Sequence, residues 1–504
     1  MRDYLSRQDV TVVGAGPNGL AAAVTLARAG LSVKILEAAA EVGGGLRSAE
    51  LTLPDFTHDV CASVMPLAVA SPFFSGLPLQ EHGVRWLYPE LQVAHPMDGD
   101  GHDVAGMGAA DAAGAAFIAA DLDATAAGLG VDGDDYRRLI GPLVAARDEI
   151  LATFLGPLKL STRPRALLSN ARFGVPALAS AALLAKLLFK SAHAHALFGG
   201  LAAHGIQPLE RPATASFALM LALLAHRPAG VGSEHGGGWP FVAGGSGRLA
   251  AALASYFTSL GGVIETGRRV TDLGELSGSR FVVLDLAPRG VLELMGWRLD
   301  GGYRRALERY RYGPGVFKLD LALSGPLPWT ADACRRAGTV HVGGTFEEIA
   351  ASERLVWRGV HPRRPFVLVA QPSVFDPTRA PDGRHTLWAY CHVPNGSTTD
   401  MTEPILGQLE RFAPGARDLV LAVHGRTAAQ YQAYDANFIG GDINSGVQDL
   451  GQLFTRPAVR WDPYSTPDER VFICSAATPP GGGVHGMGGF GAARSLLRRL
   501  SSGA

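Results

Sequence analysis

The length, composition and charge of the chain exclude several classes of protein. With 504 residues, the chain is longer than one ordinary domain. Charged residues make up 18% and hydrophobic residues 47%, which excludes an intrinsically disordered protein. The formal net charge of -1 leaves no basic surplus to neutralise phosphates, so no nucleic-acid partner is expected.

The cysteines and the apolar segments indicate the compartment. Cys61, Cys334, Cys391 and Cys474 form no CxxC pair and no zinc spacing, so neither a metal site nor a disulfide framework is predicted. This cysteine usage favours a reducing compartment. No signal-like segment begins the sequence and no run of 18 apolar residues occurs, which predicts a cytoplasmic protein.

A dinucleotide-binding pattern occupies the first part of the chain. In order it contains a strand, a GxGxxG turn, an Ala- and Leu-rich helix ended by Gly30, a second strand and an acid: residues 9–13, 14–19, 20–29, 31–36 and 37. A single GxGxxG is weak, but all five parts in register strongly predict a nucleotide site.

Each residue of the turn has a physical role in this prediction. Gly14 permits the tight turn, Gly16 lets the backbone approach a pyrophosphate, and Gly19 lets the helix pack closely on the sheet. Pro17 and Asn18 lie in the turn and are predicted to bind the cofactor next to the amino end of the helix, whose free N–H groups and positive dipole end favour phosphate.

Glu37 and Ala38 follow the second strand and are expected beside the ribose. A carboxylate at position 37 accepts hydrogen bonds from ribose hydroxyls. The same carboxylate argues against the 2′-phosphate of NADP.

A second glycine segment follows closely, at residues 43–48 (GGGLRS). It resembles the GG-x-R-S/T segment of the FAD-dependent superfamily that includes amine oxidases and phytoene desaturases. The resemblance implies that Gly44 and Gly45 pass close to the pyrophosphate, that Arg47 supplies positive charge, and that Ser48 belongs to the same FAD site.

Two later segments resemble other parts of the FAD site of this superfamily. The unit over residues 236–270 resembles the return of the chain to the flavin domain, which implies that Val270 touches the adenine through its backbone. The strand 470–476 and the glycine-rich loop 478–490 resemble the segment that closes over the flavin. That resemblance adds these residues to the predicted FAD site: Ser475, Gly482, His485, Gly486 and Met487.

The resemblance extends along nearly the whole chain and favours the bacterial, phytoene desaturase-like branch of the superfamily. The segments that carry it are residues 71–77, 312–320, 385–396 and 438–444. Met65 stands where this branch is expected to have a histidine.

The implied fold class is α/β, with a discontinuous Rossmann-like FAD-binding domain and an α+β substrate domain made of a mixed sheet and a helical cap. The expected FAD domain comprises residues 1–94, 231–300 and 440–504. The expected substrate domain comprises residues 95–230 and 301–439.

The expected substrate domain contains apolar helices and strands. Residues 177–197 and 214–225 are expected as apolar helices, which form either ordinary core or a tunnel or membrane contact for a lipid-like substrate. Strands are expected at residues 316–323, 366–370 and 386–393. Tyr390 and His392 share one face of the last strand and either line the cavity or fill the sheet.

Three side chains are candidates for catalysis, although a flavin itself performs the redox chemistry. His485, in the terminal glycine loop, acts as an acid or base or hydrogen-bonds the ring, or else anchors the loop. Lys318 holds a water at flavin N5 or pairs with Asp320. His58 enters the active site or serves only a turn.

The predicted protein is a FAD-dependent oxidoreductase that moves a hydride from an apolar or amphiphilic substrate to flavin N5. A flavin-dependent isomerase or saturase of polyenes or terpenoids and a FAD-holding assembly or regulatory protein are the alternatives. Only one GxGxxG follows a strand, so no built-in NAD(P)H site is expected. Electrons are then expected to leave to oxygen, a quinone or an acceptor that the sequence does not identify, and peripheral contact with a membrane is a further expectation.

Overall fold

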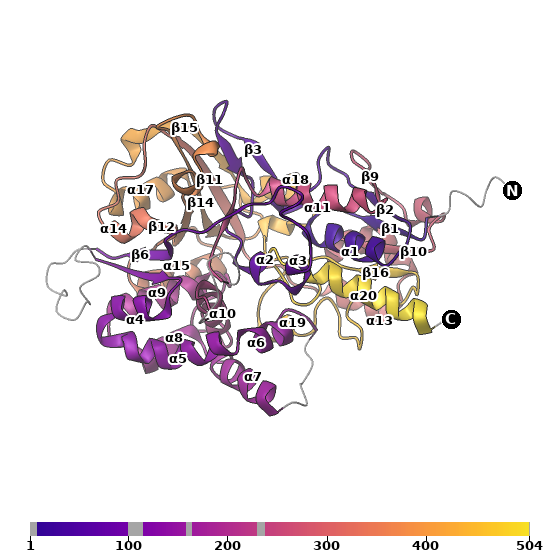
Figure 1. Ribbon diagram of the computed structural model, residues 1–504, viewed down its shortest axis with the longest axis horizontal. Helices are drawn as coiled ribbons and strands as arrows, with labels where there is room; N and C mark the ends of the chain where they lie inside the picture. The colour runs from indigo at the N-terminus through magenta and orange to yellow at the C-terminus, as the bar shows by residue number, and fades with distance from the viewer. Residues whose placement is uncertain (1–7, 99–113, 158–163, 229–236, 503–504) are drawn as a thin grey trace.

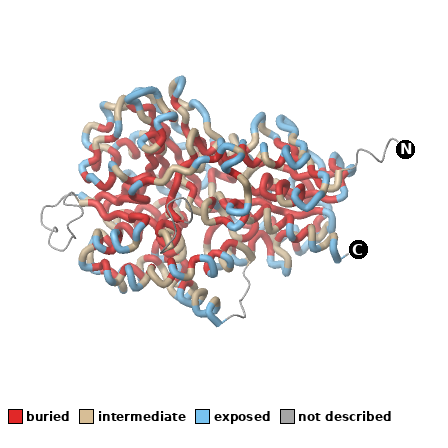
Figure 2. Tube along the Cα trace, viewed as in Figure 1, coloured by how far each residue is buried: buried red, intermediate tan, exposed pale blue. Residues whose placement is uncertain are grey.

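The computed structural model describes residues 8–98, 114–157, 164–228 and 237–502. Two sheets form the two ends of the molecule, and a group of helices lies below the larger sheet (Figure 1). The strands of both sheets run mostly through buried parts of the chain (Figure 2).

The smaller sheet is the Rossmann-like sheet predicted from the glycine pattern. Its order is β16-β10-β1-β2-β9 and all its neighbours are parallel. The strands in chain order are β1 (Val10–Val13), β2 (Val33–Leu36), β9 (Val263–Glu265), β10 (Phe281–Leu284) and β16 (Val471–Ile473). Three widely separated segments of the chain therefore build one sheet.

Both faces of this sheet are buried, and successive side chains of each strand point to opposite faces. Val12 and Ile35 belong to the apolar cluster on one face, whereas Val13 and Leu36 belong to the cluster on the other. The first face is covered by α1 (Pro17–Arg28), α11 (Gly247–Ser259) and α20 (Met487–Ser502), and the second by α12 (Pro288–Met295) and α13 (Gly301–Glu308).

The C-terminal glycine segment differs from the expected loop, because α20 begins at Met487. Gly488 and Gly489 are therefore helical, and they let α20 pack against α1. A Cβ at Gly489 would overlap the carbonyl oxygen of Asn18, and one at Gly488 would lie 2.7 Å from the carbonyl oxygen of Cys474. These two glycines serve helix packing rather than a ligand.

The larger sheet has the order β15-β11-β14-β13-β12-β6-β7, in which only β12 and β6 are parallel. Its strands in chain order are β6 (Leu91–Pro96), β7 (Ala115–Ala119), β11 (Gly315–Leu323), β12 (Ala337–Val342), β13 (Val367–Ala370), β14 (His385–Val393) and β15 (Val420–Arg426). The domain boundary predicted at residue 94 falls inside β6, so the chain enters the second domain earlier, at Leu91.

One face of the larger sheet is apolar and the other carries polar side chains. Phe317, Leu319 and Leu321 of β11 pack on the apolar side, with residues of α17 (Thr402–Phe412). Lys318 and Asp320 occupy the opposite face by alternation. In register along that face, Lys318 lies opposite Tyr390, Tyr390 opposite Leu368, and Leu368 opposite His341.

Seven helices between β7 and β8 (Phe241–Val242) cover the polar face in the described part of the chain. They are α4 (Leu122–Gly128), α5 (Gly133–Ala145), α6 (Arg147–Phe154), α7 (Pro164–Ala177), α8 (Ala181–Leu188), α9 (Ala192–Ala203) and α10 (Ala215–Ala225). The last agrees with the helix expected over residues 214–225.

The prediction of a single apolar helix over residues 177–197 is wrong, because the helical conformation is interrupted between α8 and α9. The Asp132 carboxylate accepts hydrogen bonds from the backbone N–H groups of Lys190 and Ser191, each at 2.8 Å. Ser191 then caps α9 by accepting from the N–H of Ala194 at 3.2 Å. Apolar periodicity alone does not reveal such a break.

In the described part of the chain, no single helix is both long and apolar enough to cross a bilayer. The pair α7 and α8 together meets the requirement for length and composition, but the two helices are bent by 102° at the break between them.

Candidate functional site

A cavity of about 620 Å³ extends from the amino end of α1 to the polar face of the larger sheet. This volume lies in the range of small-molecule and cofactor sites. The predicted cofactor residues that line it are Gly16, Pro17, Asn18, Gly44, Gly45, Ser475, Gly482 and His485. The sequence segments predicted to hold a dinucleotide thus meet around one space.

The turn between β1 and α1 has the geometry that its glycines require. Gly14 has φ +100°, and a Cβ at Gly19 would overlap the carbonyl oxygen of Gly14. The N–H of Gly19 donates to Asp285 Oδ2 at 2.8 Å. The first N–H groups of α1 have no intrahelical partner, and Asn18 presents this first turn to the cavity.

The two glycine segments around Gly16 and Gly44 are called the glycine cradle below. The remaining predicted cofactor residues surround this cradle without lining the cavity. They are Gly14, Gly19, Glu37, Ala38, Arg47, Ser48, Val270, Gly486 and Met487. Val270 packs on the apolar cluster that contains Leu36 and Leu273.

Glu37 is held by the chain's own amides. Its carboxylate accepts from the N–H groups of Ala15 and Ala39 at 2.7 and 2.8 Å, and Arg47 Nη2 lies 3.4 Å away. Glu37 and Arg47 therefore brace the turn after β1 in this structure.

Gly44 brings the second glycine segment against the first. Its φ is +53°, and a Cβ there would lie 3.2 Å from Gly16 Cα, tighter than ordinary contact. The N–H of the preceding Gly43 donates to the carbonyl of Ala15 at 2.8 Å. The two glycine segments are therefore packed together, and Gly16, Gly44 and Gly45 line the cavity beside this contact.

Two carboxyl groups at this end, one buried (Asp285) and one half-buried (Asp435), were missed from the sequence. Asp285, which follows β10, and Asp435 both line the cavity. Burial raises the pKa of Asp285 to about 7, and the nearby charges of Asp435 and Glu37 add to the rise. Burial likewise raises the pKa of Asp435. The position of Asp285 at the carboxyl end of a parallel strand was a usable signal, because ligands bind at that edge.

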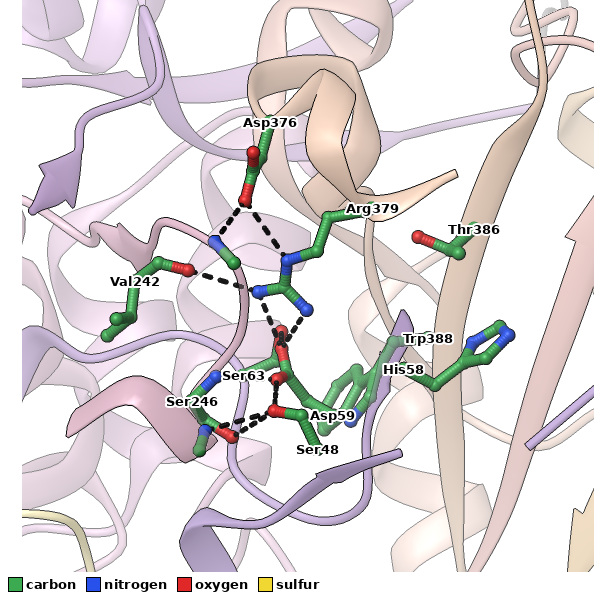
Figure 3. Close-up of polar contacts among 12 residues, drawn as sticks. Ser48, His58, Asp59, Ser63, Val242, Ser246, Asp376, Arg379, Thr386 and Trp388 are labelled. Carbon is green, nitrogen blue, oxygen red and sulfur yellow. Dashed lines mark hydrogen bonds and ion pairs between the residues drawn. The ribbon is translucent and has the colours of Figure 1, made fainter. Parts of the chain in front are cut away.

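A buried hydrogen-bond network around Asp59 connects several segments of the chain next to the cavity (Figure 3). Asp59 Oδ1 accepts from Ser48 Oγ at 2.8 Å and from the N–H of Ser246 at 2.7 Å. Asp59 Oδ2 accepts from Ser63 Oγ at 2.7 Å and pairs with Arg379 at 3.2 Å. Burial opposes ionisation of Asp59, but the Arg379 charge and these hydrogen bonds outweigh it, so the pKa of Asp59 lies below its usual value.

Arg379 extends this network to a second carboxylate. Its Nε donates to Asp376 Oδ2 at 3.2 Å, and Asp376 in turn accepts from the N–H of Gly244 at 2.6 Å. Arg379 is fully buried, so the carboxylates of Asp59 and Asp376 must compensate the loss of hydration of its positive charge. Arg379 was not predicted, because its partner Asp59 lies 320 residues away in the chain.

Lys318 and His58, two of the predicted catalytic residues, do not line the cavity. Lys318 forms a short ion pair with Asp320, and its Nζ lies 5.5 Å from the centre of the Trp388 ring. His58 Nε2 shares a 2.7 Å hydrogen bond with Thr52 Oγ1, and its Nδ1 lies 3.5 Å from Asp320. Burial lowers the pKa of His58 to about 4. The structure thus shows the pairing alternative for Lys318.

His485 lines the cavity, but both its ring nitrogens are engaged by the loop. Nε2 donates to the carbonyl of Gly481 at 3.1 Å, and Nδ1 accepts from the N–H of Met487 at 3.0 Å. Burial lowers the pKa of His485 to about 4, so the ring is neutral near pH 7. These contacts are those of a loop anchor.

Met65, Trp388 and Tyr390 also line the cavity. The Trp388 indole N–H donates to the carbonyl of Cys61 at 2.9 Å, and the Tyr390 ring lies edge-on to it at 5.0 Å. His392 does not line the cavity, since its Nδ1 pairs with Glu353 at 2.8 Å. Of the two alternatives expected from the sequence, Tyr390 lines the cavity and His392 fills the interior beside the sheet.

Comparisons with known proteins agree with this architecture. A family model described as an NAD(P)-binding Rossmann-like domain matches residues 12–75. The rat pyridine nucleotide-disulfide oxidoreductase domain-containing protein 2 is 25% identical over 98% of this chain and 94% of its own length.

Solved structures share the fold along the whole chain. An oxidoreductase from Methanosarcina mazei aligns with a TM-score of 0.63 at 16% identity, covering 97% of this chain and 99% of that one. A redesigned putrescine oxidase aligns with a TM-score of 0.60 at 18% identity, covering 98% and 99%. The chain therefore has the two-part fold of these oxidoreductases, a Rossmann-like dinucleotide domain with a second, sheet-containing domain.

Proposed function

We propose that this protein is a FAD-dependent oxidoreductase of the phytoene desaturase-like branch, acting on an apolar or amphiphilic small molecule. The observation that carries the proposal is the continuity of the cavity. It runs without a break from the glycine cradle at Gly16 and Gly44 to a chamber lined by Phe217, Met220 and Leu221. A cofactor and an apolar substrate would then share one space.

The residues around the cradle fit FAD. The amino end of α1 favours a phosphate, and the backbone contact between Gly16 and Gly44 suits an extended ligand. Bound FAD would supply the two-electron chemistry. The work of the protein is then to bind, to orient the substrate and to exclude water, and the apolar lining of Phe217 and Leu221 suits that work.

The first experiment is the absorption spectrum of the purified protein, followed by heat release and chromatography of the cofactor. We expect the visible bands of an oxidised flavin and released FAD. A colourless protein that does not take up added FAD refutes the proposal. Oxygen uptake and quinone reduction by the substrate-reduced protein then identify the electron acceptor.

A matched pair of glycine variants tests the cradle. Gly44→Ala and Gly30→Ala both place an alanine at positive φ, with a strain of about 1 kcal/mol each. Only the Cβ at position 44 meets a neighbour, because nothing lies within 4 Å of a Cβ at position 30. We expect Gly44→Ala to weaken FAD binding at least tenfold and Gly30→Ala to leave it unchanged. Equal effects of the two substitutions would assign the loss to strain alone.

The exposed surface of α7 and α8 supports the proposed peripheral membrane contact. Six leucine and valine side chains are exposed there: Leu167, Leu168, Val175, Leu178, Leu183 and Leu187. Residues 164–190 contain four basic and no acidic side chains. An apolar face with basic residues suits an anionic bilayer surface.

Flotation with vesicles tests this contact. We expect binding to phosphatidylglycerol vesicles, weaker binding to phosphatidylcholine vesicles, and loss of binding in the double variant Leu183→Ser, Leu187→Ser. If neither the unaltered protein nor the double variant floats with either kind of vesicle, the contact is refuted.

A further inference from the structure

Where the cavity reaches α9, β12 and β14, three polar side chains line this end of it among apolar neighbours. They are His204 at the end of α9, Thr339 of β12 and Tyr390 of β14. Thr339 Oγ1 is buried without a hydrogen-bond partner, and the Tyr390 hydroxyl makes no hydrogen bond to any described residue. Thr339 is 4% exposed and its hydroxyl is closed to solvent, whereas Tyr390, 8% exposed, lines the cavity.

The neighbours of His204 fix which of its nitrogens carries the proton. His204 Nε2 and His341 Nε2 are 2.9 Å apart, so one donates to the other. His341 Nδ1 is buried without a partner and faces Gly200, where a Cβ would lie 2.7 Å away. A buried unpaired N–H costs more than a buried unpaired lone pair. The proton of His341 therefore sits on Nε2 and is donated to His204, which leaves the His204 proton on Nδ1.

No charged side chain lines this end of the cavity among the described residues. The charged lining residues, Asp285, Asp435, Arg456 and Arg460, belong to the cradle and to the C-terminal segments. Burial lowers the pKa of His204 to about 3, so its ring is neutral. A charged group placed here would lose its hydration without a counter-charge in the lining.

We propose that His204, Thr339 and Tyr390 form a subsite for a neutral oxygen, a carbonyl or hydroxyl group, at one end of an otherwise apolar substrate. His204 Nδ1–H donates to that oxygen, and the two hydroxyl groups donate or accept. The surrounding Trp239 and Leu368 bury the apolar carbons next to it. This subsite rests on the proposed function only in taking the cavity as the substrate site.

The subsite predicts a preference among three ligands of equal chain length. Binding of 2-undecanone, undecane and undecylamine is measured with the flavin-loaded protein, by quenching of tryptophan fluorescence and by the shift of the flavin spectrum. Trp239 and Trp388 both line the cavity and report occupancy. We expect the ketone to bind at least tenfold more tightly than the alkane and more tightly than the amine.

Two conservative variants separate the subsite from general stability. Thr339→Val and Tyr390→Phe each remove one hydroxyl that has no partner in the protein, so folding should be unaffected. Each should weaken ketone binding about fivefold, the effect of one neutral hydrogen bond, and leave alkane binding unchanged.

Thr386→Val is the matched control. Thr386 Oγ1 is also buried and unpartnered (Figure 3), and Thr386 belongs to the same strand as Tyr390. Thr386 does not line the cavity. Ketone binding to this variant should equal that of the unaltered protein.

The outcomes are distinct from those for the flavin proposal. Equal affinity for ketone and alkane, tighter binding of the amine, or the same ketone affinity in all three variants would each overturn the subsite. Flavin content is read in the same samples. If no flavin is present, tryptophan quenching still measures the ketone preference, so failure of the proposed function leaves the subsite testable.

Discussion

The Asp285 carboxyl group makes the stability of the flavin-free protein depend on pH. Its pKa is about 7 in the folded protein against 3.8 in an unperturbed chain, because burial penalises the charged form. Between these two values the folded state binds more protons than the unfolded state. The free energy of unfolding therefore falls as the pH rises through this window.

The size of this effect follows from the two pKa values. A shift of one pKa unit corresponds to about 1.4 kcal/mol, and integration from pH 5 to pH 8 gives a loss of roughly 2–3 kcal/mol from this one group. Asp285→Asn removes the titration and keeps an oxygen that accepts from the N–H of Gly19. The variant should lack this loss and become the more stable protein at pH 8.

Urea unfolding of the flavin-free protein, followed by tryptophan fluorescence at pH 5, 6, 7 and 8, measures the effect. The informative quantity is the difference between the two proteins in their change from pH 5 to pH 8, because other titrating groups cancel in it. A variant whose pH dependence parallels that of the unaltered protein would refute the assignment of a raised pKa to Asp285.

Three further substitutions test the packing around the site. Arg379→Met leaves the carboxylate of Asp59 buried without its counter-charge and should cost about 3–5 kcal/mol in urea unfolding; a loss below 1 kcal/mol would contradict the role given to this network. His485→Ala removes both hydrogen bonds of the loop anchor and should cost about 2–4 kcal/mol in unfolding free energy, whereas unchanged stability with lost turnover would favour the catalytic alternative. Gly489→Ala should lower the thermal midpoint, since its Cβ would overlap the backbone of α1, whereas Gly407→Ala, exposed in α17 with open space around it, should add about 1 kcal/mol; the same response at both positions would argue against close packing of α20 on α1.

The elements of the dinucleotide domain were predictable because local chemistry determines them. The GxGxxG turn requires glycine for backbone reasons that hold in any context, and Gly14 and Gly19 take the conformation and contact expected of them. The strands β1 (VTVV), β2 (VKIL) and β10 (FVVL) are short and mainly apolar, as expected for a sheet covered on both faces.

The features that were not predicted depend on residues distant in the sequence. The pairing of Arg379 with Asp59 joins positions 320 residues apart. The helix break before Ser191 depends on the Asp132 carboxylate, which no local pattern reveals. The glycine-rich C-terminal loop was read too broadly, since glycine suits close helix packing as well as ligand contact, and only the position of α1 separates the two roles of Gly488 and Gly482.

The order of the strands in the Rossmann-like sheet has a consequence for synthesis on the ribosome. β1 and β2 leave the ribosome first, but β10 follows almost 250 residues later and β16, with its covering helix α20, comes last. Contacts between such distant segments form slowly, because the intervening chain must be closed into a loop first. The apolar faces of β1 and α1 therefore stay uncovered through most of translation. We expect chaperones to bind the nascent chain during this time. The proposed cofactor site is also completed late, because the loop that carries Gly482, which lines the cavity, follows β16.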